Sequence, residues 1–253
     1  MDQFVPGKLI TETLRDTVKV PNKKAKMIAH RGLCGLELEN TNASFVAAGQ
    51  RSFYGVETDT QRTKDGYFIA FHDGELNGMM GVDAKVCDLT LAELQQYRMK
   101  DYWEKRTRSD LFIPTLDEYI RICKHYNKVC FLEIKGKFSD QDITDLIALI
   151  KEEDYLDNIV FISGDWDNLM ALRRQLPDHP AQLGCGKVED DMIEKLVANK
   201  IDISPYFEHL TEEIVKKLKA AGLVVNPWLV NEVPNVEILD RWGVDQITSN
   251  FIE

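Results

Sequence analysis

The chain lacks a long apolar run, an excess of positive charge and paired cysteines. No segment approaches the roughly 20 consecutive apolar residues that a transmembrane helix needs. The first 26 residues are polar and lack the apolar core of an export signal. Lys and Arg total 31 against 42 Asp and Glu, which gives a formal net charge of −11. That balance argues against a nucleic-acid binder and against docking or stable insertion at an anionic membrane.

Cysteine usage indicates the compartment. The five cysteines are an odd number, and no two of them have Cys-x-x-Cys spacing: Cys34, Cys87, Cys123, Cys130 and Cys185. We interpret them as free thiols in a reducing compartment, which predicts a cytoplasmic protein. No feature of the sequence fixes an oligomeric state.

Short β-like runs alternate with helical patterns along most of the chain. Such alternation predicts an α/β protein with a parallel sheet and helices outside it. The nine strand candidates are Met27–His30, Gly55–Thr60, Tyr67–His72, Val129–Lys135, Asn158–Ser163, Ala181–Gly186, Ile201–Pro205, Leu223–Trp228 and Val244–Thr248. Capping boxes at Thr90…Glu93 and Thr115…Glu118 predict two helix starts.

One connection is too short for a parallel crossover, which needs about a dozen residues. Only Gln61–Gly66 separates the second and third strand candidates. We therefore expect these two to form an antiparallel hairpin that turns at Asp65-Gly66. The remaining eight strands predict a TIM (β/α)8 barrel. Residues 1–253 would form one barrel domain, with a small cap inserted after the second strand at about 61–113.

Acidic residues fall where such barrels carry their chemistry, at the C-terminal ends of the strands. Glu57 and Asp59 share one strand face, and Glu133 closes the next barrel strand. A single Glu-x-Asp pair is common on an exposed strand. Three converging carboxylates repel one another and need a cation, and oxygen-only ligands favour Mg²⁺ or Ca²⁺ over zinc.

Two of the five histidines, His30 and His72, also fall at predicted strand ends. Such a pair fits proton transfer to and from a reacting group. Arg31 and Lys135 add positive charge, so that a mouth with a bound dication carries about one net positive charge and suits a phosphate. The other three histidines are expected on the surface: His125, His179 and His209.

Together, these segments resemble the glycerophosphodiester phosphodiesterase family. The resemblance runs from about residue 27 to 250, and the ordered spacing of its motifs makes it specific. The main motifs are His30-Arg31-Gly32, Glu39-Asn40-Thr41, Glu57-Thr58-Asp59, His72-Asp73, Glu133-Ile134-Lys135 and Trp228-Leu229-Val230-Asn231. The chain departs from the family at Leu38, in the loop Asn77–Lys85 and at Thr248-Ser249-Asn250-Phe251.

The resemblance implies a TIM barrel with a small cap, and it implies a role for each candidate residue. Glu57, Asp59 and Glu133 would hold the divalent metal. His30 and His72 would be the acid/base pair. Arg31 and Lys135 would contact the phosphate, and Trp228 would wall the glycerol. Glu39 and Asn40 would support the metal and phosphate ligands from behind.

The expected function is metal-dependent hydrolysis of glycerophosphodiesters to glycerol 3-phosphate and an alcohol. Attack by the glycerol 2-hydroxyl and direct attack by water are both compatible with the residues, and either histidine could be the acid. A lysophospholipase-D-like activity on lipid phosphodiesters is an alternative, with Met79-Met80 contacting an acyl chain. A catalytically inactive binding barrel is the alternative from another class.

Overall fold

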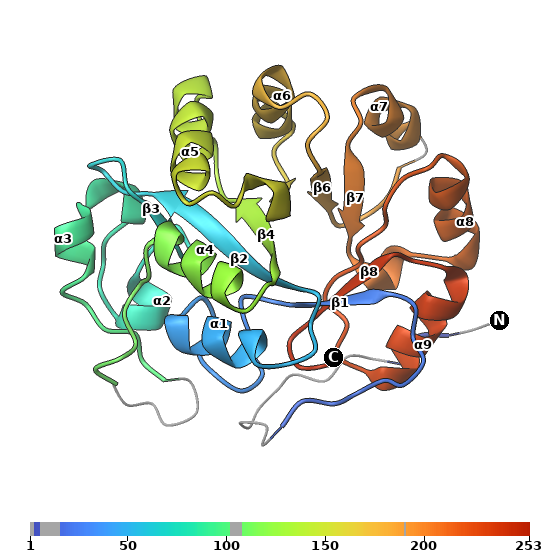
Figure 1. Cartoon of the computed structure of the whole chain (residues 1–253), viewed down its shortest axis with the longest axis horizontal. Helices are drawn as coiled ribbons and strands as arrows, with labels where there is room; N and C mark the ends of the chain where they lie inside the picture. Colours follow the sequence, from blue (N-terminus) through green and yellow to red (C-terminus); the bar gives the residue numbers. More distant parts are fainter. Residues whose placement is uncertain (1–2, 6–15, 102–107, 190) are drawn as a thin grey trace.

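The structure is a computed structural model that describes residues 3–5, 16–101, 108–189 and 191–253. Within these residues, seven parallel strands form one curved sheet in the order β7-β6-β5-β4-β2-β1-β8 (Figure 1). The strands are β1 (Lys26–Ala29), β2 (Gly55–Arg62), β4 (Val129–Ile134), β5 (Ile159–Ser163), β6 (Ala181–Cys185), β7 (Asp202–Pro205) and β8 (Gln246–Ser249). The predicted TIM barrel is confirmed.

The eighth position of the barrel is filled by an irregular segment. The predicted strand Leu223–Trp228 is wrong, because this segment does not form a regular strand. Val225 makes an isolated parallel bridge to Ile203 of β7, and Trp228 makes one to Tyr206 just after β7. Val230 N donates to Thr248 O of β8 at 3.0 Å. Pro227 has no N–H to donate, so a continuous ladder cannot form along this segment. The segment still lies between β7 and β8, and its hydrogen bonds link the two ends of the sheet.

The expected hairpin is confirmed. β3 (Phe68–Ala70) pairs antiparallel with the end of β2, with Thr60 opposite Ala70. The turn closes through the hydrogen bond from Gly66 N to Thr63 O, and Gly66 has φ +92°. That left-handed conformation favours glycine. The C-terminal end of β2 therefore extends past its pairing with β4 and pairs with β3 instead.

Helices cover the outside of the sheet (Figure 1). They are α1 (Asn42–Gly49), α4 (Leu116–His125), α5 (Asp140–Glu152), α6 (Trp166–Gln175), α7 (Met192–Ala198), α8 (Glu212–Ala220) and α9 (Val233–Trp242). Both expected capping boxes are present, at Thr90 before α3 (Leu91–Leu94) and at Thr115 before α4. Among the described residues, no helix combines the length and the apolar character that crossing a membrane requires.

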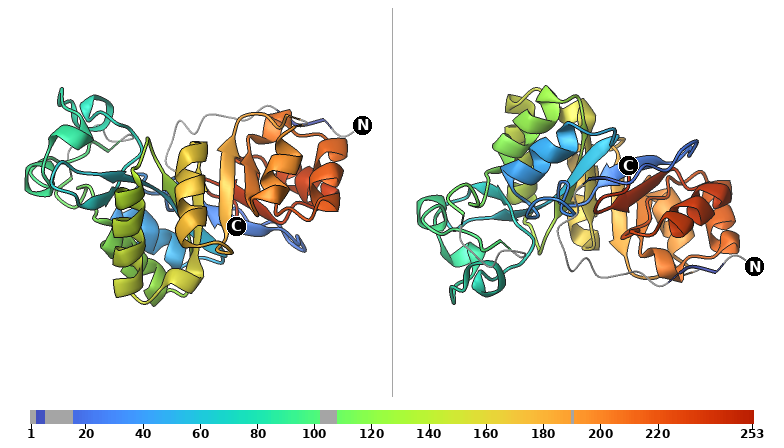
Figure 2. Two further views of the ribbon diagram at one scale, coloured as in Figure 1. Left: turned by 90° about the horizontal axis from the view of Figure 1, so that it is seen from above. Right: turned by 90° about the horizontal axis from the view of Figure 1, so that it is seen from below.

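The segment between β3 and α4 packs around a hydrophobic cluster of its own. It contains α2 (Asn77–Met80), the 3₁₀ turn η1 (Val86–Asp88) and α3, which lie together at one end of the molecule (Figure 2). Two more 3₁₀ turns, η2 (Leu156–Asn158) and η3 (Phe207–His209), precede β5 and follow β7. Met79 and Met80 are buried in the hydrophobic cluster around α2 and α3. These side chains therefore offer almost no exposed surface for the expected contact with an acyl chain.

Candidate active site

The three predicted metal ligands meet at the C-terminal ends of β2 and β4. Asp59 lies directly opposite Glu133 in the parallel register, and Glu57 is two residues before Asp59 on the same strand face. Ligand oxygens of all three lie within 4.8 Å of one another. Glu57 Oε1 is buried and has no hydrogen-bond partner. An orphaned carboxylate oxygen within an all-oxygen donor set fits a hard divalent cation.

The pKa values of these acids reflect the crowding. Burial, together with Asp59 and Glu133, raises the pKa of Glu57 well above its usual value. Burial and the Asp59 charge also raise the pKa of Glu133. Burial works in the same direction on Asp59, but Arg31 and Lys135 outweigh it and lower the pKa of that carboxyl. The charged form is therefore favoured at Asp59 and disfavoured at Glu57 and Glu133.

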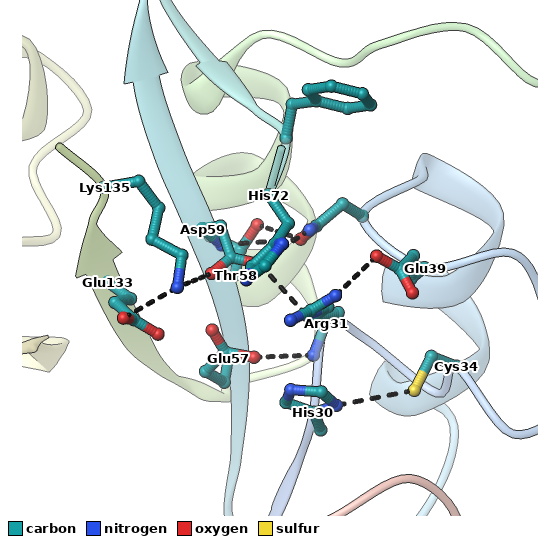
Figure 3. A network of polar contacts seen from close by, with 12 residues as sticks. His30, Arg31, Cys34, Glu39, Glu57, Thr58, Asp59, His72, Glu133 and Lys135 are labelled. Carbon is teal, nitrogen blue, oxygen red and sulfur yellow. Dashed lines mark hydrogen bonds and ion pairs between the residues drawn. The ribbon is translucent and has the colours of Figure 1, made fainter. Parts of the chain in front are cut away.

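Arg31 connects the end of β1 to two of these acids. Its backbone N–H donates to Glu57 Oε2 at 2.7 Å, and its guanidinium Nε lies 3.2 Å from Asp59 Oδ2 (Figure 3). Nη1 donates to Glu39 Oε1 at 2.6 Å. Burial lowers the pKa of Arg31, but the three carboxylates outweigh it, so the charge is fixed. Glu39 thus holds the guanidinium beside the two carboxylates.

Asn40 supports the same site from the loop after β1. It has φ +51°, a left-handed conformation that Asn tolerates better than most residues. Its Nδ2 donates to Asp59 Oδ2 at 2.9 Å, and its Oδ1 accepts from Thr58 Oγ1 at 2.8 Å. Thr58 is buried, and apart from its place in the Glu-Thr-Asp motif nothing in the sequence singled it out. Asn40 therefore orients Asp59 through Oδ2, and Oδ1 of the same carboxylate faces Lys135.

Lys135 lies on the opposite side of the acids. Its Nζ is 2.9 Å from Glu133 Oε1 and 3.3 Å from Asp59 Oδ1. Burial lowers the pKa of Lys135, but the two carboxylates outweigh it and raise the pKa overall. Arg31 and Lys135 thus flank the carboxylates from two strands, and both stay charged at neutral pH (Figure 3).

The two predicted catalytic histidines have different partners. His72 follows β3, is partly buried, and its Nδ1 lies 2.8 Å from Asp73 Oδ1. Gln61 anchors this loop by donating to Phe71 O and Asp73 O at 2.8 and 2.7 Å. His30 instead has its Nδ1 2.8 Å from Asn250 Oδ1. Burial and the neighbouring Arg31 lower the pKa of His30 to about 3, so its ring is neutral at pH 7.

These groups face one cavity of about 230 Å³ at the barrel mouth. Its lining includes seven predicted site residues: His30, Arg31, Glu57, His72, Glu133, Lys135 and Trp228. Asp59, Glu39 and Asn40 lie behind them through the contacts described above. Trp228 is held by a hydrogen bond from Nε1 to Ser204 O at 3.0 Å, and its ring centroid is 5.3 Å from that of Tyr206.

The rest of the wall was not predicted from the sequence. Small or apolar side chains and two hydroxyl groups complete the cavity: Ile162 of β5, Gly184 and Cys185 of β6, Gly186 just after β6, Ser204 of β7 and Thr248 of β8. Asn250, the partner of His30, was not predicted either, although it follows β8 directly. The rule that singled out the other candidates, a polar residue at the C-terminal end of a barrel strand, would have found it.

The remaining histidines lie outside the cavity lining. His125 and His209 are exposed, as expected. The expectation is wrong for His179, which is partly buried, places Nε2 2.9 Å from Ile159 O and packs against Phe161. The flanking Asp178 and Pro180 suggested a solvated turn, but the ring turns inward onto β5.

Comparison with known proteins fits this geometry. Residues 30–253 match the glycerophosphoryl diester phosphodiesterase family. A glycerophosphodiester phosphodiesterase of Caldanaerobacter subterraneus is 28% identical over 232 residues, which cover 90% of this chain and 94% of that protein. One of Bacillus subtilis is 28% identical over 244 residues, or 88% of this chain and 83% of that protein.

A solved structure extends the comparison to the fold. An Oleispira antarctica phosphodiesterase, determined in complex with the product sn-glycerol-3-phosphate, superposes with a TM-score of 0.82 at 26% identity. The match covers 89% of this chain and 93% of that one. The family match spans most of the chain, and its relatives align over most of their length. The chain therefore belongs to the glycerophosphoryl diester phosphodiesterase family, a family of phosphoric diester hydrolases.

Proposed function

We propose that the chain hydrolyses glycerophosphodiesters to glycerol 3-phosphate and an alcohol, and that it requires a divalent metal. The observation that carries the proposal is one cavity lined by carboxylates, by the positively charged Arg31 and Lys135, and by two histidines. The Oleispira antarctica relative, whose structure holds sn-glycerol-3-phosphate, supports the product.

Glu57, Asp59 and Glu133 would hold the metal, either Mg²⁺ or Ca²⁺. When bound, such an ion polarises phosphoryl oxygens and lowers the pKa of a coordinated hydroxyl. The chain's own contribution is the placement of the donors: the register of β2 and β4 sets Asp59 opposite Glu133, and the Arg31 N–H holds one oxygen of Glu57.

The basic residues would bind the substrate phosphate. Arg31 and Lys135 approach Asp59 from two sides, so a phosphate at the mouth would meet fixed positive charge on both flanks. The ring of Trp228, held by Ser204 and packed against Tyr206, would form the wall beside the glycerol.

The two histidines would move the protons. One would take a proton from the attacking hydroxyl and the other would give one to the departing alcohol oxygen. Both rings line the same cavity, and Arg31 and Glu57 lie between them in the view of Figure 3.

We further propose that residues 61–113 act as a cap on a single barrel domain and contact the departing alcohol. His72 belongs to this segment and lies two residues after the end of β3. Arg108 bonds to Glu37 in the loop after β1, at 3.3 Å, which ties the cap to the barrel. The cytoplasmic location stays a prediction; the five cysteines are free thiols in the structure.

A head-group panel tests the proposal. The metal-loaded protein would be incubated with glycerol phosphodiesters of choline, ethanolamine, glycerol, inositol and serine, and glycerol 3-phosphate would be quantified. Release from at least one ester, lost in the variant Glu133→Gln, supports the proposal. Binding of the esters without any turnover would contradict it and would favour a barrel that only binds.

A further inference from the structure

Asn250 contacts His30 on the side away from the acids. Its Oδ1 lies 2.8 Å from His30 Nδ1, and it also accepts from Cys34 Sγ at 3.0 Å. In Figure 3 the His30 ring edge that faces Cys34 is opposite the edge on the side of Glu57. The proposed chemistry uses neither Asn250 nor Cys34.

The chemistry of the three groups fixes the proton on the ring. A carboxamide oxygen only accepts hydrogen bonds, so the His30 nitrogen that faces it must carry the hydrogen. Burial raises the pKa of the Cys34 thiol, so the thiol stays protonated and is a donor. The 3.0 Å contact from Cys34 Sγ to Asn250 Oδ1 is the one in which the thiol donates, so it favours the orientation in which the amide oxygen faces both Cys34 and His30.

The backbone holds Asn250 in place independently of its side chain. Its N–H donates to Asn231 Oδ1 at 3.0 Å, and its carbonyl oxygen accepts from Gly35 N at 3.0 Å. These two backbone hydrogen bonds hold Asn250 beside His30, and a substitution of the Asn250 side chain leaves both of them intact.

We propose that Asn250 is a positioning residue that keeps the proton of His30 on Nδ1, so that an unprotonated Nε2 faces the cavity. In that tautomer Nε2 accepts a proton from the attacking hydroxyl and cannot donate one beforehand. The inference deepens the proposed function and rests on it for the meaning of this proton transfer. His72 has a contrasting partner, the Asp73 carboxylate, whose Oδ1 lies 2.8 Å from the ring Nδ1.

The tautomer can be read without any turnover. ¹⁵N NMR of the histidine rings, assigned with His30→Gln, distinguishes a protonated from an unprotonated ring nitrogen. In the unmodified protein we expect the proton of His30 on Nδ1. Asn250→Ala should give a mixture of tautomers, whereas Asn250→Asp, which keeps an acceptor in the same place, should retain the Nδ1 proton. Cys34→Ala should retain it as well.

Kinetics then test the consequence. Asn250→Ala should lower kcat by roughly 10- to 100-fold, as loss of a supporting partner typically does, with KM little changed. Asn250→Asp should recover much of that loss. Asn235→Ala is the matched control, because Asn235 is also buried but bonds to Val5, away from the mouth. This control should leave both the His30 tautomer and kcat unchanged.

Two results would overturn the inference: a proton on Nε2 of His30 in the unmodified protein, or an Asn250→Ala variant with an unchanged tautomer and an unchanged kcat. Failure of the proposed function would look different. A protein that hydrolyses no glycerophosphodiester, but shows the expected tautomers, would refute the activity and leave the role of Asn250 in holding the ring intact.

Discussion

Asp59 and Glu133 lie directly opposite each other on the neighbouring parallel strands β2 and β4, and Lys135 Nζ contacts both carboxylates. Their burial and mutual repulsion make this pair costly unless positive charge is supplied. The fixed cations supply it mainly to Asp59, whose pKa is lowered, while the pKa values of Glu133 and Glu57 are raised.

The acids should therefore differ in their effect on stability without metal. Glu57→Gln removes a carboxylate that lacks enough positive charge, so the Tm of the metal-free protein should rise. Asp59→Asn leaves Arg31 and Lys135 without their shared partner, so the Tm should fall. Both variants should lose metal affinity, measured by titration calorimetry, and at least about 100-fold in turnover. A Glu57→Gln protein with normal metal affinity would remove Glu57 from the metal site.

The five histidines should separate into two classes. His30→Ala and His72→Ala should each lower turnover by at least about 100-fold, the usual scale of general acid–base catalysis, with metal still bound. Exposed His125 and His209, changed to Ala, should stay within about threefold, as surface substitutions do. Initial rates at saturating substrate and metal are the measurement. A fully active His30→Ala protein would show that His30 is not part of the chemistry.

A substrate with a good leaving group should distinguish the proposed roles of His30 and His72. An alcohol needs protonation as it departs, but p-nitrophenolate does not. If His72 is the proton donor, His72→Ala should recover substantially on a p-nitrophenyl phosphodiester, and His30→Ala should not. Equal recovery of both variants, or of neither, would mean that the two rings bind the phosphate rather than transfer protons.

His179 should contribute to the pH dependence of stability. Burial lowers the pKa of His179 in the folded protein, so below about pH 6.5 the unfolded chain binds a proton that the folded chain resists. Stability should be lost as the pH falls through that region. His179→Gln should show a smaller fall in Tm between pH 7.5 and pH 5 than the unmodified protein. His125→Gln, at an exposed site, should behave like the unmodified protein; an identical profile for His179→Gln would contradict this account.

Local sequence signals predicted most of the fold. Apolar runs bounded by turns marked the regular strands to within two residues at either end, and the short connection at Asp65-Gly66 identified the hairpin. The prediction of a regular strand at Leu223–Trp228 was wrong, although Pro227 in the sequence argues against a continuous strand there. Its place between β7 and β8 depends on tertiary hydrogen bonds that no local pattern encodes.

The same division applies to the site. Strand ends brought together the acids, the basic residues and both histidines, because parallel strands end at one edge. The partner of His30 could not be found locally, since Asn250 lies 220 residues away along the chain and meets it only when β8 pairs with β1. Likewise, the inward turn of His179 depends on its contact with Phe161.

Metal dependence of glycerol 3-phosphate release tests the central claim most directly. The purified protein would be assayed on a glycerophosphodiester as prepared, after chelation with EDTA and removal of the chelator, and after addition of Mg²⁺ or Ca²⁺. The cluster of Glu57, Asp59 and Glu133 predicts that chelation abolishes release and that one of the two ions restores it. Full turnover in the metal-stripped protein would contradict the account.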